Sequence, residues 1–185
     1  MLQPSRDDNL IQELIEGCSN NELKCQEMLY KYFFGYALAI AIRYVGDRGE
    51  AIEVVDDSFL KIFDKFFMYD QERDFKGWLR RVVINTAIDK IRKGKGRNSK
   101  ERNINESDII SLKENDADTG LYLTELHELV KQLPSLHRVV FNMYEVEGFS
   151  HKEIGEKLKI PESSSRTYLT RAKKELRKLY KRYFQ

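Results

Sequence analysis

The sequence is poor in the residues that build disulfide, metal and membrane structures. It contains two cysteines, three histidines and three prolines, and its longest apolar run, YALAIAI at 36–42, is short. Cys18 and Cys25 are too few for a disulfide framework or a metal cage, and a membrane span needs about 20 apolar residues. The polar start, MLQPSRDDN, is unlike a secretory signal. We expect a cytoplasmic protein with reduced thiols and with neither a metal nor a cofactor.

The scarcity of proline, together with only ten glycines, favours long helices over a turn-rich β fold. Apolar residues recur at three-and-four spacing in 8–46, 50–67 and 75–92, and again in four shorter segments between 122 and 182. No segment is a convincing strand. The sequence therefore predicts an all-α protein, and its 41% apolar residues are sufficient for a buried core.

One stretch breaks the helical pattern and predicts a division of the chain. Residues 94–119 are rich in Asn, Ser, Asp and Gly and have no sustained apolar face. Such a composition is typical of a solvated, flexible linker. We expect two small helical domains, at 8–95 and 121–185, joined by a linker at 96–120.

The formal net charge of +2 hides alternating blocks of opposite sign. Residues 45–75 hold nine acids and four bases, whereas 76–102 hold ten bases and two acids. Residues 103–119 are acidic again, and 166–182 hold eight bases and one acid. Two basic blocks separated by an acidic stretch indicate two nucleic-acid surfaces on one chain.

The stretch SHKEIGEKLKIPESSSRTYLTRAKKEL, at 150–176, is typical of a helical hairpin that reads DNA. Ser150 and Glu153 form a capping-box pattern, and Pro161 suits the first turn of the second helix. If Ser165 and Leu169 face the core, short polar side chains and arginines face outward, where they can contact base edges. A solvated hairpin with a basic tail is the plainer alternative. The DNA-contacting residues that we expect are His151, Lys152, Ser164, Arg166, Thr167, Thr170, Arg171 and Lys174.

Two segments stand in a fixed order along the chain: EVVDDSFLKIFDKF followed by FKGWLRRVVINTAIDKIRK, and then the segment from LPSLHRVVF to AKKELRK. They resemble region 2 and region 4, respectively, of the extracytoplasmic-function subfamily of bacterial RNA polymerase sigma factors. The resemblance covers roughly 20–95 and 122–182. It implies a specificity subunit, not an enzyme, that directs core polymerase to promoters. The implied partners are core RNA polymerase (through its β′ clamp helices and β flap), promoter DNA and an anti-sigma factor.

The resemblance also implies roles for residues in the first half. The polymerase-docking positions are Asp56, Asp57, Phe59 and Lys61. An exposed acidic helix face is the plainer explanation of the two aspartates. The positions that open and hold the −10 element are Tyr69, Arg73, Phe75, Trp78, Arg81, Asn85, Lys90 and Arg92. A lone tryptophan on an apolar face is often a core residue, and an asparagine here can bind a base edge or cap locally.

The second helical hairpin departs from the family pattern at two places. Lys159 stands where the family usually has a turn glycine, and Ser163-Ser164-Ser165 replaces the usual Gly-Thr-Val. Ser165 stands where a buried aliphatic is expected, which predicts looser packing beneath the helix. In region 2, Asp56 stands where the family often has glutamine. The hairpin changes bear on promoter preference more than on family membership.

Two other classes of protein fit parts of the sequence. A free-standing transcription regulator would bind duplex DNA through 150–182 and use 20–95 for sensing or dimerisation. An enzyme acting on nucleic acid would need clustered carboxylates, but Asp56 and Asp57 are adjacent, project in different directions and lack a nearby histidine.

Overall fold

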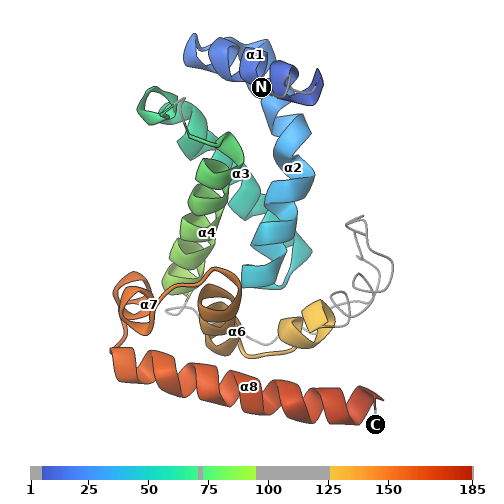
Figure 1. Ribbon diagram of the computed structural model, residues 1–185, viewed down its shortest axis with the longest axis vertical. Helices are drawn as coiled ribbons and strands as arrows, with labels where there is room; N and C mark the ends of the chain where they lie inside the picture. The colour runs from blue at the N-terminus through green and yellow to red at the C-terminus, as the bar shows by residue number, and fades with distance from the viewer. Residues whose placement is uncertain (1–5, 71–72, 95–125, 185) are drawn as a thin grey trace, which may run out of the picture.

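The computed structural model describes residues 6–70, 73–94 and 126–184, and every regular element in them is a helix (Figure 1). The first half comprises α1 (Arg6–Ser19), α2 (Leu23–Val45), α3 (Arg48–Asp64), the short 3-10 helix η1 (Phe66–Met68) and α4 (Phe75–Gly94). The second half comprises a helical stretch at 126–131, α6 (Ser135–Phe141), the π-helical turn η2 (Asn142–Val146), α7 (His151–Leu158) and α8 (Glu162–Phe184). The all-α prediction is confirmed. The predicted linker lies outside the described residues.

Local signals in the sequence explain where the helices of the first half begin and end. Gly46 adopts φ 82° and donates its N–H to Ile42 O at 2.8 Å, which closes α2. The Asp47 side chain accepts the Glu50 N–H at 2.9 Å and starts α3. Because this cap follows the glycine directly, α3 begins at Arg48, two residues earlier than the apolar pattern predicts.

The core of the first half is a bundle of α2, α3 and α4, and α1 packs against α2 (Figure 1). Its most buried side chains come from all three long helices and include Leu29, Leu38, Val54, Ile62, Leu79 and Val83. No helix of the described residues is long and apolar enough to cross a membrane.

The second half packs directly against this bundle. Its helices α6 and α7 contact α2 and α4, whereas α8 lies across the far side of α6 and α7 (Figure 1). Val139, Val140, Met143 and Ile154 belong to the same buried cluster as the side chains of α2–α4. The two halves therefore share a continuous apolar seam.

Candidate nucleic-acid interface

The helical hairpin formed by α7 and α8 is built from the local signals that its sequence contains. Ser150 N–H donates to Glu153 at 2.8 Å, and Ser150 Oγ accepts the Glu153 N–H at 3.3 Å, which confirms the capping box. Pro161 lies just before α8, where its carbonyl accepts the N–H groups of Ser164 and Ser165. The turn between the two helices places Lys159 at φ 54° and ψ 51°, in the left-handed region.

Helix α8 turns one face to the core and a polar face outward. Ser165, Leu169 and Ala172 are buried, as their spacing predicts. The exposed predicted DNA contacts on this helix are Arg166, Thr167, Thr170, Arg171 and Lys174, and Ser164 is half-buried at the edge of this face. The predicted orientation of the helix is confirmed, and the DNA contacts themselves stay predictions.

Hydrogen bonds along α8 define what its exposed face offers to a ligand. Thr167 and Thr170 donate their hydroxyl protons to Ser163 O and Arg166 O, each at 3.0 Å. Their oxygens are therefore left as acceptors beside a methyl group. Arg166 reaches back to Glu162 at 2.5 Å in an exposed pair, and such pairs exchange readily with solvent. The exposed face of α8 thus presents two hydroxyl acceptors and the Arg166 guanidinium, which can leave Glu162 to bind a ligand.

Ser165 of α8 and His151 of α7 form a polar contact on the buried side of α8. Ser165 is fully buried, and its Oγ lies 3.0 Å from His151 Nδ1. The His151 ring stacks on Tyr144 with 4.4 Å between ring centroids. Burial, and secondly Arg166, lowers the pKa of His151. The buried serine is thus hydrogen-bonded, so looser packing is not needed to accommodate it. The lowered pKa disfavours the charged form of the stacked His151 ring, which makes it a weaker candidate for a phosphate contact than Lys152, which is exposed.

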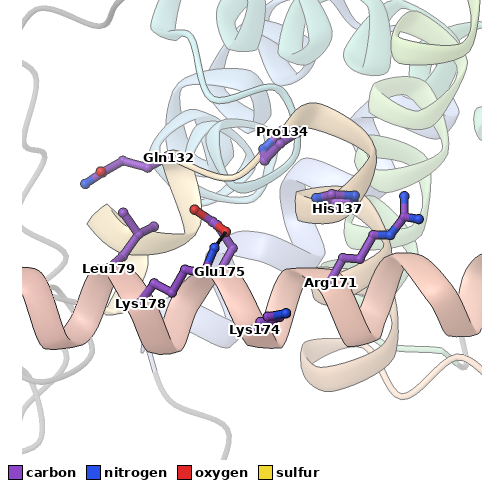
Figure 2. A pocket seen from close by; sticks show the side chains of 8 residues that line it. All are labelled: Gln132, Pro134, His137, Arg171, Lys174, Glu175, Lys178 and Leu179. Atoms are coloured by element: carbon purple, nitrogen blue, oxygen red, sulfur yellow. Dashed lines mark hydrogen bonds and ion pairs between the residues drawn. The ribbon is translucent and has the colours of Figure 1, made fainter.

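A groove of about 400 Å³ lies beside α8, facing the segment from Gln132 to His137. Figure 2 shows Arg171 extending from α8 on the His137 side, with Lys174 and Lys178 further along the helix. Lys178 pairs with Glu175 at 3.4 Å. Burial, and secondly the nearby Arg171, lowers the pKa of His137. The groove therefore continues the positive face of α8.

The predicted −10 residues in the first half divide into packed aromatics and exposed polar groups. Phe75 is 3% exposed and packs on Phe33 with 5.1 Å between ring centroids, so it is a core residue here, and its contact with DNA stays a prediction. Tyr69 and Trp78 are half-buried and stack on each other at 5.0 Å. Trp78 also meets Phe66 edge to face, so it serves the core at least in part.

The polar −10 candidates are mostly engaged by other side chains. Arg73 pairs with Asp70 at 3.0 Å and Arg92 with Asp89 at 2.7 Å, while Lys90 bonds to Glu53 and Arg81 is exposed. Asn85 accepts a hydrogen bond from Lys157 Nζ at 3.0 Å. Asn85 is exposed, so the base contact or local cap that its sequence position allowed stays a prediction.

The predicted docking residues on α3 comprise two exposed aspartates, an exposed lysine and one buried phenylalanine. Asp56 accepts the Tyr30 hydroxyl at 2.8 Å. Burial, and secondly this hydrogen bond, raises the pKa of Tyr30 to about 12. Lys61 donates to Thr86 at 3.0 Å. Phe59 is 2% exposed and lies in the core, so it supports α3 and does not form part of its outer surface.

Several exposed or paired residues were not predicted. Leu60, Phe67 and Met68 are large apolar side chains that are 66% to 84% exposed. Leu60 was not predicted because it lies next to the buried stripe of α3 and not within it. Apolar spacing predicts only the residues of the buried stripe. Arg138 and Glu147 contact the first half from the second. A charged residue amid the apolar run LHRVVF was the available signal for Arg138.

Comparison with known proteins matches both halves. The Sigma-70 region 2 family model matches residues 29–97 and the Sigma-70 region 4 model matches 123–176. The RNA polymerase sigma-H factor of Pseudomonas aeruginosa is 24% identical over 178 residues, which cover 90% of this chain and 92% of that protein. The ECF RNA polymerase sigma factor SigM of Bacillus subtilis is 25% identical over 158 residues, or 83% and 94% of the two chains.

A solved structure shows the same fold. It is the sigma factor RpoE in complex with the anti-sigma factor NepR from Bartonella quintana, with a TM-score of 0.53. The two chains are 19% identical, and the match covers 84% of this chain and 96% of that one.

An all-helical fold with regions 2 and 4 in order defines a transcription-initiation factor. The chain belongs to the sigma-70 family, within its extracytoplasmic-function subfamily. It directs promoter-specific initiation by core RNA polymerase, so the free-standing regulator is no longer needed as an explanation.

Proposed function

We propose that the two halves act as separate domains with divided tasks. Residues 8–95 dock on core polymerase and open the −10 element, and 121–185 read the −35 element as duplex DNA. The observation that carries this division is the two-faced helix α8, with a buried side around Leu169 and an exposed side of threonines, arginines and lysine. Arginine forks and hydroxyl acceptors are the groups that read base edges in a major groove.

Docking on polymerase uses the exposed acidic face of α3. Asp56 and Asp57 provide clustered negative charge, and Lys61 borders it. Clustered charges opposite a basic partner set register and speed association more than they add affinity. Phe59 holds the helix in place from beneath.

Opening of the −10 element uses the region around Tyr69 and Trp78, with Arg81 and Asn85 on the exposed side of α4. Extracted bases are held by aromatic stacking and nearby positive charge. Tyr69 and Trp78 already stack on each other, so one of them must move away from the other to accept a base between them.

The protein supplies specificity and the polymerase supplies catalysis, so the chain is not itself an enzyme. Its place is the cytoplasm, where polymerase and promoter are found. By analogy with the matched RpoE–NepR complex, an anti-sigma protein is its regulatory partner.

Charge reversal at the docking face tests this division. Asp56→Lys with Asp57→Lys should lower the association rate with core polymerase roughly tenfold or more, because steering is lost. Glu156→Lys, at an exposed position on α7, makes the same kind of charge change elsewhere and serves as the control. Equal losses for both variants, or loss of duplex binding by the docking variant alone, would contradict the proposal.

A further inference from the structure

The docking face of α3 contains an exposed carboxylate that is bonded from a neighbouring helix. Asp56 lies on the exposed side of α3, and its Oδ1 atom accepts a hydrogen bond from the Tyr30 hydroxyl at 2.8 Å. Tyr30 belongs to α2, 26 positions earlier in the chain. Helices α2 and α3 pack against each other in the bundle, so the hydroxyl and the carboxylate meet at the edge of the packed core.

The Tyr30 ring is held in place by aromatic neighbours. It meets Phe59 edge to face with 5.0 Å between ring centroids, and it lies 5.4 Å from the Phe34 ring in a tilted pair. Phe59 is 2% exposed and Tyr30 is half-buried. Aromatic rings prefer such tilted and edge-to-face arrangements, which stabilise one orientation of each ring. The Tyr30 hydroxyl therefore has a defined position beside α3, and the buried Phe59 supports it.

The Tyr30 hydroxyl is a hydrogen-bond donor throughout the neutral pH range. Burial, and secondly the hydrogen bond to Asp56, raises the pKa of Tyr30 to about 12. An ionised carboxylate can only accept hydrogen bonds, through either of its two oxygens. Tyr30 engages Oδ1, so the other oxygen of Asp56 is oriented as an acceptor for a partner's donor. A cationic donor forms the strongest hydrogen bond to such an oxygen.

An exposed apolar side chain lies one helical turn beyond Asp56. Leu60 is 68% exposed, and residues four apart are neighbours on the surface of a helix. Asp57 and Asp64 are exposed on the same helix. Apolar residues surrounded by polar ones are typical of the centre of a protein interface. A partner that covers Leu60 also removes water from Asp56, and a carboxylate that loses water must meet its donor in good geometry.

The restraint on Asp56 has a consequence for binding that differs from the effect of its charge. A side chain that becomes ordered on binding loses rotamer freedom, and this loss weakens association. Because Tyr30 already restrains Asp56 in the free protein, less freedom is lost when a partner binds. The Tyr30 hydroxyl is uncharged, so it does not contribute to electrostatic steering, which sets the association rate. Its effect therefore falls on the dissociation rate.

We propose that Tyr30 is a positioning residue for the binding of core polymerase, and that its hydroxyl orients the Asp56 carboxylate toward a cationic donor on the polymerase. The docking site thus extends from α3 to a residue of α2, which the sequence did not indicate. The inference rests on the proposed function, because it assumes that Asp56 meets the polymerase.

A double-mutant cycle with a matched control tests the proposal. Tyr30→Phe removes the hydroxyl and keeps the ring that packs on Phe59. Asp56→Ala removes the carboxylate, and a third variant combines the two changes. Tyr32→Phe removes a hydroxyl from an exposed position of the same helix and serves as the control. Surface plasmon resonance on immobilised core RNA polymerase gives the association and dissociation rates of each full-length protein, and circular dichroism confirms its helix content.

We expect Tyr30→Phe to weaken polymerase binding about three- to tenfold, through faster dissociation at an unchanged association rate. The same change should cause no further loss in the Asp56→Ala protein, and Tyr32→Phe should bind like the wild type. Wild-type affinity of Tyr30→Phe beside weakened binding by Asp56→Ala would overturn the positioning role. An equal loss from Tyr30→Phe with and without the Asp56 carboxylate would also overturn it. Wild-type binding by Asp56→Ala would instead refute the proposed docking face, and the inference with it, so the two failures are distinguishable.

Discussion

Replacing Lys159 by glycine should stabilise the helical hairpin that presents α8. Lys159 ends α7 at φ 54° and ψ 51°, one of two non-glycine residues with positive φ among the described residues. A side chain with a Cβ atom in this conformation costs about 1–2 kcal/mol. Glycine avoids that cost but gives up about 0.5–1 kcal/mol because its unfolded chain is freer. We expect a net gain of about 0.5–1 kcal/mol in the free energy of unfolding.

Lys159→Ala separates backbone strain from the lysine side chain. Alanine keeps the Cβ atom and removes the exposed amine, so its free energy of unfolding should stay near that of the wild type. Urea unfolding followed by circular dichroism measures all three proteins, and fluorescence of Trp78, the single tryptophan, reports the first half. Equal gains for alanine and glycine, or a loss with glycine, would refute the reasoning from backbone strain.

Three further predictions concern the second half. Gly155→Ala brings a Cβ atom to 2.9 Å from a backbone carbonyl oxygen, whereas the control Gly35→Ala meets nothing within 4 Å. Urea unfolding should therefore give Gly155→Ala a free energy of unfolding about 1–3 kcal/mol lower than that of Gly35→Ala. Arg166→Ala should weaken binding to the preferred duplex by about 1–3 kcal/mol if Arg166 reads a base. Competition titrations measure this loss, and an equal loss on every DNA sequence would indicate a phosphate contact. Burial lowers the pKa of His137 and of His151, so the unfolded chain binds protons more tightly and the free energy of unfolding should fall as pH drops below about 6.5. His151→Gln should make the free energy of unfolding depend less on pH. The same pH profile in wild type and variant would contradict this prediction.

Local features of the fold were predictable because they depend on neighbours in the sequence. Three-and-four spacing placed Ser165 and Leu169 on the buried side of α8, and the Ser150–Glu153 pattern placed the start of α7. Lys159 stands where the family usually has a turn glycine, and the structure places it in the left-handed conformation that glycine favours, which was not predicted.

The burial of two candidate site residues has one physical origin. Resemblance assigns a role to a position in a helix, but burial depends on which way that position faces in the packed bundle. Phe59 and Phe75 lie in the right segments and point inward. Large apolar side chains in an amphipathic helix default to the core, so direct contacts are better assigned to their exposed neighbours, such as Asp57 and Arg81.

The contacts between halves could not be predicted from local patterns. Arg138 and Glu147 meet partners 94 and 67 residues away in the sequence. Charge counting detected a basic block around Arg80 but not the carboxylate that neutralises it. Only the packing of α6 and α7 against α2 and α4 brings these groups together.

Transcription in vitro tests the central claim most directly. Purified protein and core RNA polymerase are combined with a library of genomic promoter fragments, and transcript starts are mapped. The account predicts initiation from a defined subset of fragments that depends on this protein and is lost on charge reversal at Asp56 and Asp57. No initiation from any fragment, together with tight and specific duplex binding by the protein alone, would contradict it.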